Sequence, residues 1–155
     1  MATRVIDRPK VPENFVDASE LLTVLTAYRS GDFTARMGSD RTGLAGKVSD
    51  ILNEVIARNQ RFANEVSRVY EAVAREGRIN QRVLLPMAMG SWETAAECIN
   101  QLIQDLVQPT AEMGRVIGAV ARGDLGQKMS LEVEGKPLSG EFLKTAKSVN
   151  TMVDQ

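Results

Sequence analysis

Residues 119–129 read AVARGDLGQKM, and within them a glycine is followed by one apolar residue two positions later and a second four positions after that. The same pattern occurs as AYRSGDFTARM at residues 27–37 and as VAREGRINQRV at residues 73–83. The glycines, Gly31, Gly77 and Gly123, therefore recur every 46 residues. A marker at a fixed spacing of this size indicates an array of structural repeats. The sequence predicts three copies of one unit.

A second landmark recurs in each copy, where a glycine precedes an asparagine by ten residues. The pairs are Gly43 with Asn53, Gly90 with Asn100, and Gly140 with Asn150. Counted from the asparagine, positions −8, −4, −1 and +3 hold apolar or small residues, which is the heptad-type series of helices that pack side by side. This predicted helix seam comprises Ala45, Ser49, Leu52 and Ile56; Trp92, Ala96, Ile99 and Ile103; and Phe142, Ala146, Val149 and Val153.

Each unit is predicted to contain two helices joined by an irregular connector. Alignment on the 46-residue period places the first-helix columns at Val24/Tyr70/Val116, Ala27/Val73/Ala119 and Tyr28/Ala74/Val120. The first helix should end at the repeated glycine, which suits a left-handed C-terminal cap. The predicted connector and packing residues are Gly31, Phe33 and Met37; Gly77, Ile79 and Val83; and Gly123, Leu125 and Met129. The third connector, which contains Leu131 and Val133, is interpreted as irregular rather than as a strand.

The predicted boundaries lie inside helices. Residues 1–14 read as a flexible leader, and the units are predicted at residues 15–58, 59–106 and 107–155, with the last helix cut short. Asp17 or Ser19 could cap the first helix. Residues 43–75 and 91–122 are each expected to form a nearly continuous helical rod, the second with Pro109 as a kink or as the start of the third unit.

Two short helices and a connector cannot enclose a core alone. A connector of 12 residues or more can span one helix length, which permits both helices of a unit to run in the same direction. The fold class expected is all-α, with three consecutive parallel four-helix bundles formed by a homodimer and joined by near-continuous helices. An antiparallel monomeric bundle remains an alternative on these grounds.

Composition excludes several classes of function. The chain has 19 basic and 20 acidic residues, so no electrostatic footprint for nucleic acid is present. It has no histidine and a single cysteine, Cys98, which is expected to be buried and inert. No metal, cofactor or catalytic constellation is predicted, so a non-enzymatic segment is expected. No apolar run is long enough to span a bilayer, which favours a cytoplasmic location.

The repeated pattern resembles the HAMP domain, a parallel four-helix signalling module of sensor kinases and chemoreceptors, over residues 15–155 in three concatenated copies. The third copy is the most similar, and its phrasing resembles the poly-HAMP region at the N-terminus of group III hybrid sensor histidine kinases. Pro109 matches the family's first-helix proline and Glu141 its second-helix glutamate. Leu44 and Ser91 replace that glutamate in the other copies, and the second copy has Arg78 where the others have aspartate.

The resemblance implies a homodimeric relay that transmits helix repacking to a downstream output domain, such as a histidine kinase. It also implies that Glu141 controls a junction between modules. The alternatives are a passive dimeric spacer, the HAMP array of a chemoreceptor, and an antiparallel monomeric repeat that binds peptides. From the residues alone, the asparagines are expected to bond the connector backbone or to pin the helix register, with a switching role as the alternative. Trp92 and Phe142 are expected to fill a bundle end.

The two junctions between units differ in length. Asn53 precedes Gly77 by 24 residues, whereas Asn100 precedes Gly123 by 23. One residue rotates an α-helix by about 100°. The spacing therefore predicts that the two junctions present different faces and that adjacent units adopt different packing states.

Overall fold

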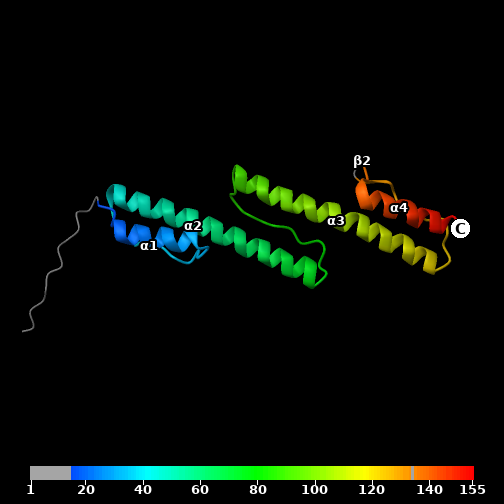
Figure 1. Ribbon diagram of the computed structural model, residues 1–155, viewed down its shortest axis with the longest axis horizontal. Helices are drawn as coiled ribbons and strands as arrows, with labels where there is room; N and C mark the ends of the chain where they lie inside the picture. Colours follow the sequence, from blue (N-terminus) through cyan, green and yellow to red (C-terminus); the bar gives the residue numbers. More distant parts are fainter. Residues whose placement is uncertain (1–14, 134) are drawn as a thin grey trace, which may run out of the picture. The chain divides into compact units, whose positions relative to one another are not determined.

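The computed structural model describes residues 15–133 and 135–155, so the predicted leader at residues 1–14 lies outside the described residues. The elements are α1 (Ala18–Arg29), α2 (Gly43–Tyr70), the π-helical turn η1 (Glu71–Arg75), α3 (Ser91–Ala121), β1 (Glu132–Val133), β2 (Lys136–Pro137) and α4 (Gly140–Val153) (Figure 1). The predicted all-α class is confirmed. The arrangement as three dimeric bundles stays a prediction.

The chain forms two compact units, one ending at Ser67 and the other beginning at Arg68. The division falls inside α2, which continues across it because that stretch of sequence contains no residue that breaks a helix. The three-unit boundaries at residues 58/59 and 106/107 stay a prediction.

The first unit consists of α1, its connector and most of α2. The Asp17 carboxylate accepts hydrogen bonds from the backbone N–H groups of Ser19 (2.9 Å) and Glu20 (3.3 Å), so Asp17 is the N-cap. The helices α1 and α2 run in the same direction, with the connector returning alongside them (Figure 1). The two helices of this unit are therefore parallel, as the length of the connector permits.

The glycine caps of the first and third copies are alike. Gly31 and Gly123 have φ of 86° and 84°, a region that L-side chains rarely adopt. The next residue in each case donates its backbone N–H to a carbonyl five residues earlier, from Asp32 to Ala27 and from Asp124 to Ala119, both at 3.0 Å. These bonds close the helix in a Schellman motif, as the pattern predicted.

The second copy ends its first helix differently. The N–H of Glu76 bonds the carbonyl of Glu71, and the N–H of Arg78 bonds that of Ala72 at 2.8 Å, six residues earlier instead of five. One extra residue is therefore accommodated in η1, between Ala72 and Gly77 (φ 68°).

This π turn corrects two predictions. Val69 and Ala72 are buried, whereas Tyr70 is 55% exposed, so the buried column is Val24/Val69/Val116. Ala72 likewise takes the place of Val73 in the column with the buried Ala119 and the half-buried Ala27, so neither column follows the 46-residue period. Val69 follows Asn53 by 16 residues, as Val116 follows Asn100. The expectation that the two junctions differ in phase was wrong, because the extra residue lies beyond the buried valine.

The second unit contains the end of α2, η1, the second connector, α3, the third connector and α4. The helices α3 and α4 run in the same direction (Figure 1). Their core consists of Val116, Met129, Ala146, Val149 and Val153. Pro109 lies inside α3 and is fully buried, and α3 continues through it to Ala121.

The third connector contains a short hairpin that the sequence interpretation rejected. Glu132 pairs with Pro137 and Val133 with Lys136 in antiparallel register, and the N–H of Leu138 bonds the carbonyl of Leu131 at 2.8 Å. The prediction of a wholly irregular connector was wrong, because β1 pairs with β2, a second strand of the same connector.

Candidate functional site: the connector and its asparagine

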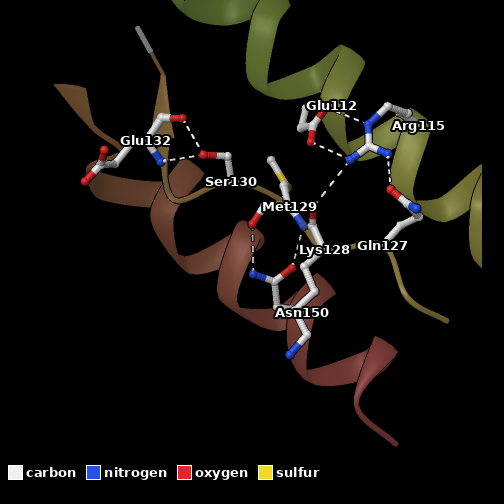
Figure 2. A network of polar contacts seen from close by, with 8 residues as sticks. All are labelled: Glu112, Arg115, Gln127, Lys128, Met129, Ser130, Glu132 and Asn150. Atoms are coloured by element: carbon white, nitrogen blue, oxygen red, sulfur yellow. Dashed lines mark hydrogen bonds and ion pairs between the residues drawn. The ribbon is translucent and has the colours of Figure 1, made fainter. Parts of the chain in front are cut away.

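One arrangement of hydrogen bonds is present in all three copies. The asparagine of the second helix accepts a hydrogen bond through Oδ1 from the backbone N–H of the second connector anchor and donates through Nδ2 to its carbonyl. The pairs are Asn53 with Met37 (2.8 and 2.9 Å), Asn100 with Val83 (2.7 and 3.0 Å), and Asn150 with Met129 (2.7 and 3.0 Å). We call each pair an asparagine clasp. Figure 2 shows the third one.

The anchor of each asparagine clasp is buried. Met37, Val83 and Met129 are all at most 3% exposed. Met37 packs against Val24 and Ile56, and Met129 belongs to the core of α3 and α4. The side chain of the anchor is thus held by apolar packing and its backbone by an amide side chain, so the connector is fixed to the second helix at one point.

The first helix holds the same part of the connector from the other side. In the first copy, Glu20 accepts the N–H of Gly38 at 2.7 Å and forms an ion pair with Arg41. In the third copy, Glu112 accepts two bonds from Arg115, at 2.7 and 2.9 Å (Figure 2). In the first copy the residue directly after the anchor is therefore bonded by a glutamate of the first helix.

Two arginines make a second contact of this kind. Arg68 donates to the Gln81 side chain (2.9 Å) and to the Arg82 carbonyl (2.8 Å). Arg115 donates to the Gln127 side chain (2.9 Å) and to the Lys128 carbonyl (3.4 Å). The connectors of the second and third copies are thus bonded to both helices, and a rotation of either helix must break or drag these bonds.

Loss of the Glu112 charge should destabilise the chain mildly at acid pH. The hydrogen bond from Arg115 lowers the pKa of Glu112 below its ordinary value of 4.5. A lowered pKa stabilises the fold above the unfolded-state value, and this contribution is lost as pH falls through the folded value. Between about pH 5 and pH 3, the wild type should lose more free energy of unfolding than Glu112→Gln, by less than about 1 kcal/mol because the site is solvated. Urea titrations across that range provide the measurement, and parallel pH curves would contradict the prediction.

The first connector anchor is less uniform than the sequence predicted. Phe33 is half-buried and its ring lies 5.5 Å from that of Tyr28. Ile79 and Leu125, at the same position, are 39% and 58% exposed. Only the first copy therefore packs this residue within the chain.

The predicted helix seam faces the chain's own first helix and connector. Ile56, Val149 and Val153 are buried, while Leu52, Ile99 and Ile103 are half-buried. Trp92 and Phe142 are also half-buried. Whether these positions line a shared dimer interior stays a prediction.

A second heptad series, one position further round, was missed from the sequence. It occupies positions −9, −5, −2 and +2 from the asparagine, and in α2 it reads Leu44, Val48, Ile51 and Val55. Leu44, Ile51 and Val55 are exposed, as are Leu22 and Leu25 of α1. The other copies hold polar residues at −9, namely Ser91 and Glu141, which weakens the signal. The first unit thus exposes apolar side chains from both of its helices.

Ser49 is fully buried, and its hydroxyl has no hydrogen-bond partner. The other copies have Ala96 and Ala146 at this position. An unsatisfied buried hydroxyl destabilises a fold, and serine is a poorer helix former than alanine. Ser49→Ala should therefore raise the free energy of unfolding by about 1 kcal/mol. A lower denaturation midpoint for the variant would contradict this.

Cys98 and Glu141 were also singled out in the sequence, and the structure tests the first but not the second. Cys98 is exposed, so the prediction of a buried cysteine was wrong; it lies at the −2 position of the exposed series. Glu141 lies in the first turn of α4, where its negative charge interacts favourably with the helix dipole, and it accepts a hydrogen bond from Lys144 at 2.6 Å. Its junction role stays a prediction.

Residues 15–133 and 135–155 contain no cluster of three or more potential metal ligands. None of the helices in that same part of the chain combines the length and apolar character that a membrane span requires.

Residues 87–155, which include all of α3 and α4, match the HAMP domain family. A HAMP domain is therefore found in this part of the chain, and the family consists of signal-transduction relay modules. HAMP domains are non-catalytic linkers that typically act as dimers. No solved structure matches the chain.

Proposed function

We propose that the whole chain is an array of three HAMP copies that relays conformational change along a parallel homodimer. The observation that carries this proposal is the asparagine clasp, which occurs with the same atoms in all three copies although the match to the family covers residues 87–155. A two-point hydrogen bond between equivalent residues is hard to explain unless the units share one fold.

A relay requires an element with two arrangements that both ends can bias. The seam of each unit contains small residues, Ser49, Ala96 and Ala146, which allow helices to shift against one another with little steric cost. Each connector is bonded to the second helix by its asparagine, and in the second and third copies an arginine bonds it to the first. Helix movement and connector movement are thereby coupled, and the long helix α3 passes the change onward.

The exposed apolar face of the first unit supports the homodimer. Ile51 is 63% exposed, and it belongs to a series with the heptad spacing of paired parallel helices. A second copy of the chain in the same orientation would cover this face with the identical series. The dimeric habit of HAMP domains favours this occupant over an unrelated protein.

The output is proposed to be a downstream domain of the sensor histidine kinase class, because the third copy resembles the poly-HAMP region of group III hybrid kinases. The array would then work in the cytoplasm. A chemoreceptor output would require the same array and the same mechanics.

Locking one end of the dimer and observing the other separates a relay from a spacer. Ile51→Cys in a Cys98→Ser background places one thiol per chain on the exposed series of α2. After oxidation, amide hydrogen exchange of α4 should differ between the locked and the reduced protein, because the first unit can no longer repack.

The matched control carries Cys98→Ser alone and is treated with the same oxidant. Unchanged exchange in α4 of the locked dimer would identify a passive spacer. Failure of Ile51→Cys to cross-link at all would overturn the proposed parallel homodimer.

A further inference from the structure

We propose that η1 is a movable π turn that gives the second copy's first helix two alternative registers. This inference deepens the proposed relay by naming one of its two-state elements. It begins from the extra residue that the second copy accommodates between Ala72 and Gly77. A π turn holds one more residue than an α-turn without ending the helix, and such turns are common at functional sites.

The sequence around η1 is apolar in both registers. In the present one, Val69 and Ala72 are buried. If the extra residue were accommodated earlier in α2, the helix between the two places would turn by about 100°. Tyr70 and Val73 would then occupy the buried positions, at the 46-residue spacing from Val116 and Ala119. Each register therefore places a pair of apolar side chains at the same two core positions, either Val69 with Ala72 or Tyr70 with Val73.

The register decides whether the first helix holds the second connector. In the present register Arg68 bonds Gln81 and the carbonyl of Arg82, as Arg115 bonds the third connector. In the alternative register the position of Arg115 is taken by Val69, which has no polar group to donate. The second connector would then lose these bonds and keep its asparagine clasp with Asn100. A one-residue shift thus releases one side of the connector.

Two deletions of equal size isolate the two registers. Deletion of Ala74 removes the extra residue within η1 and should fix the present register. Deletion of Ala63 removes a residue upstream in α2 and should fix the alternative one. Both variants have the same length, and neither needs a π turn.

Thiol reactivity reports the register directly. Val69→Cys and Tyr70→Cys are introduced separately into Cys98→Ser chains and treated with a maleimide under native conditions. Without a deletion, the thiol at 69 should be largely protected but react measurably through the second register. Deletion of Ala74 should slow that reaction at least several-fold, whereas deletion of Ala63 should expose the thiol at 69 and protect the one at 70.

Equal reactivity at position 69 with and without the Ala74 deletion would overturn the inference, as would protection of position 69 in the Ala63 deletion. If a deletion impairs folding by circular dichroism, Tyr70→Asp replaces it. Residue 70 is exposed in the present register, so an aspartate fits there, whereas the alternative register would bury its charge. Tyr70→Asp should therefore also slow the reaction of the thiol at position 69. These outcomes do not depend on transmission to α4, so failure of the relay experiment and failure of the register switch are distinguishable.

Discussion

Replacement of Asn150 by alanine is expected to lower the free energy of unfolding by about 2 to 3 kcal/mol. The Asn150 side chain satisfies both the N–H and the carbonyl of Met129, at 2.7 and 3.0 Å, in a half-buried position. Alanine removes both partners and leaves two backbone groups unpaired next to a core residue. Removing the partner of a buried polar group costs more than the bond's own net contribution. Chemical denaturation followed by circular dichroism measures the loss.

The control is Asn59→Ala. Asn59 donates one bond at 2.9 Å to the Val55 carbonyl within the same helix, and that bond is exposed. Its loss should change the free energy of unfolding by less than about 0.5 kcal/mol. Asn150→Asp adds a second test, because the carboxylate can still accept the Met129 N–H but repels its carbonyl. Equal stability of Asn150→Ala and Asn59→Ala would show that the asparagine clasp does not hold the connector.

Gly46→Ala is expected to destabilise the first unit by about 1 to 3 kcal/mol. A Cβ atom at this position would overlap the backbone carbonyl of Arg41, which cannot move as a flexible side-chain end can. The cause is the first connector, which at 12 residues from Gly31 to Gly43 is the shortest of the three. The longer connectors tolerate Glu93 and Leu143 at the same position.

Gly114→Ala is the matched control, since Gly114 also lies inside a helix but a Cβ there meets no atom within 4 Å. Alanine should stabilise that helix by up to about 1 kcal/mol, because glycine is a poor helix former. Opposite signs of the two effects would confirm that the close connector, and not helix propensity, governs Gly46. A stabilising effect of Gly46→Ala would contradict the packing of the first connector.

The glycine caps and the second connector anchors were visible in the sequence because each depends on local chemistry. Gly31 needs a positive φ, and Met37 sits at a fixed distance from it, so both recur visibly in each copy. The bonds of Asn53, Asn100 and Asn150 to the connector were one of two structural roles that the sequence left open, the other being to pin the helix register, since an amide beside an apolar stretch needs a partner.

Three features escaped prediction for identifiable physical reasons. The π turn was hidden because Val69 with Ala72 and Tyr70 with Val73 fit the apolar pattern equally well. The hairpin in the third connector is held by two-residue strands, which leave almost no alternation to detect. The exposed series of α2 is apolar through Ile51, but Ser91 and Glu141 interrupt its equivalents in the other copies.

The rate of disulfide formation at Cys98 tests the parallel homodimer most directly. Cys98 lies at the −2 position of the exposed series, so two parallel chains in register would bring the two thiols close to the axis of the dimer and to each other. A disulfide needs Cα atoms roughly 4.4–6.8 Å apart. Glu97→Cys in a Cys98→Ser background places the control thiol on the same exposed helix but about 100° away from the series.

Dilute wild-type protein is expected to cross-link on the order of a hundredfold faster than the control, because the reaction within a dimer is intramolecular. Equal, slow and concentration-dependent cross-linking of the two proteins would contradict the parallel homodimer and with it the relay.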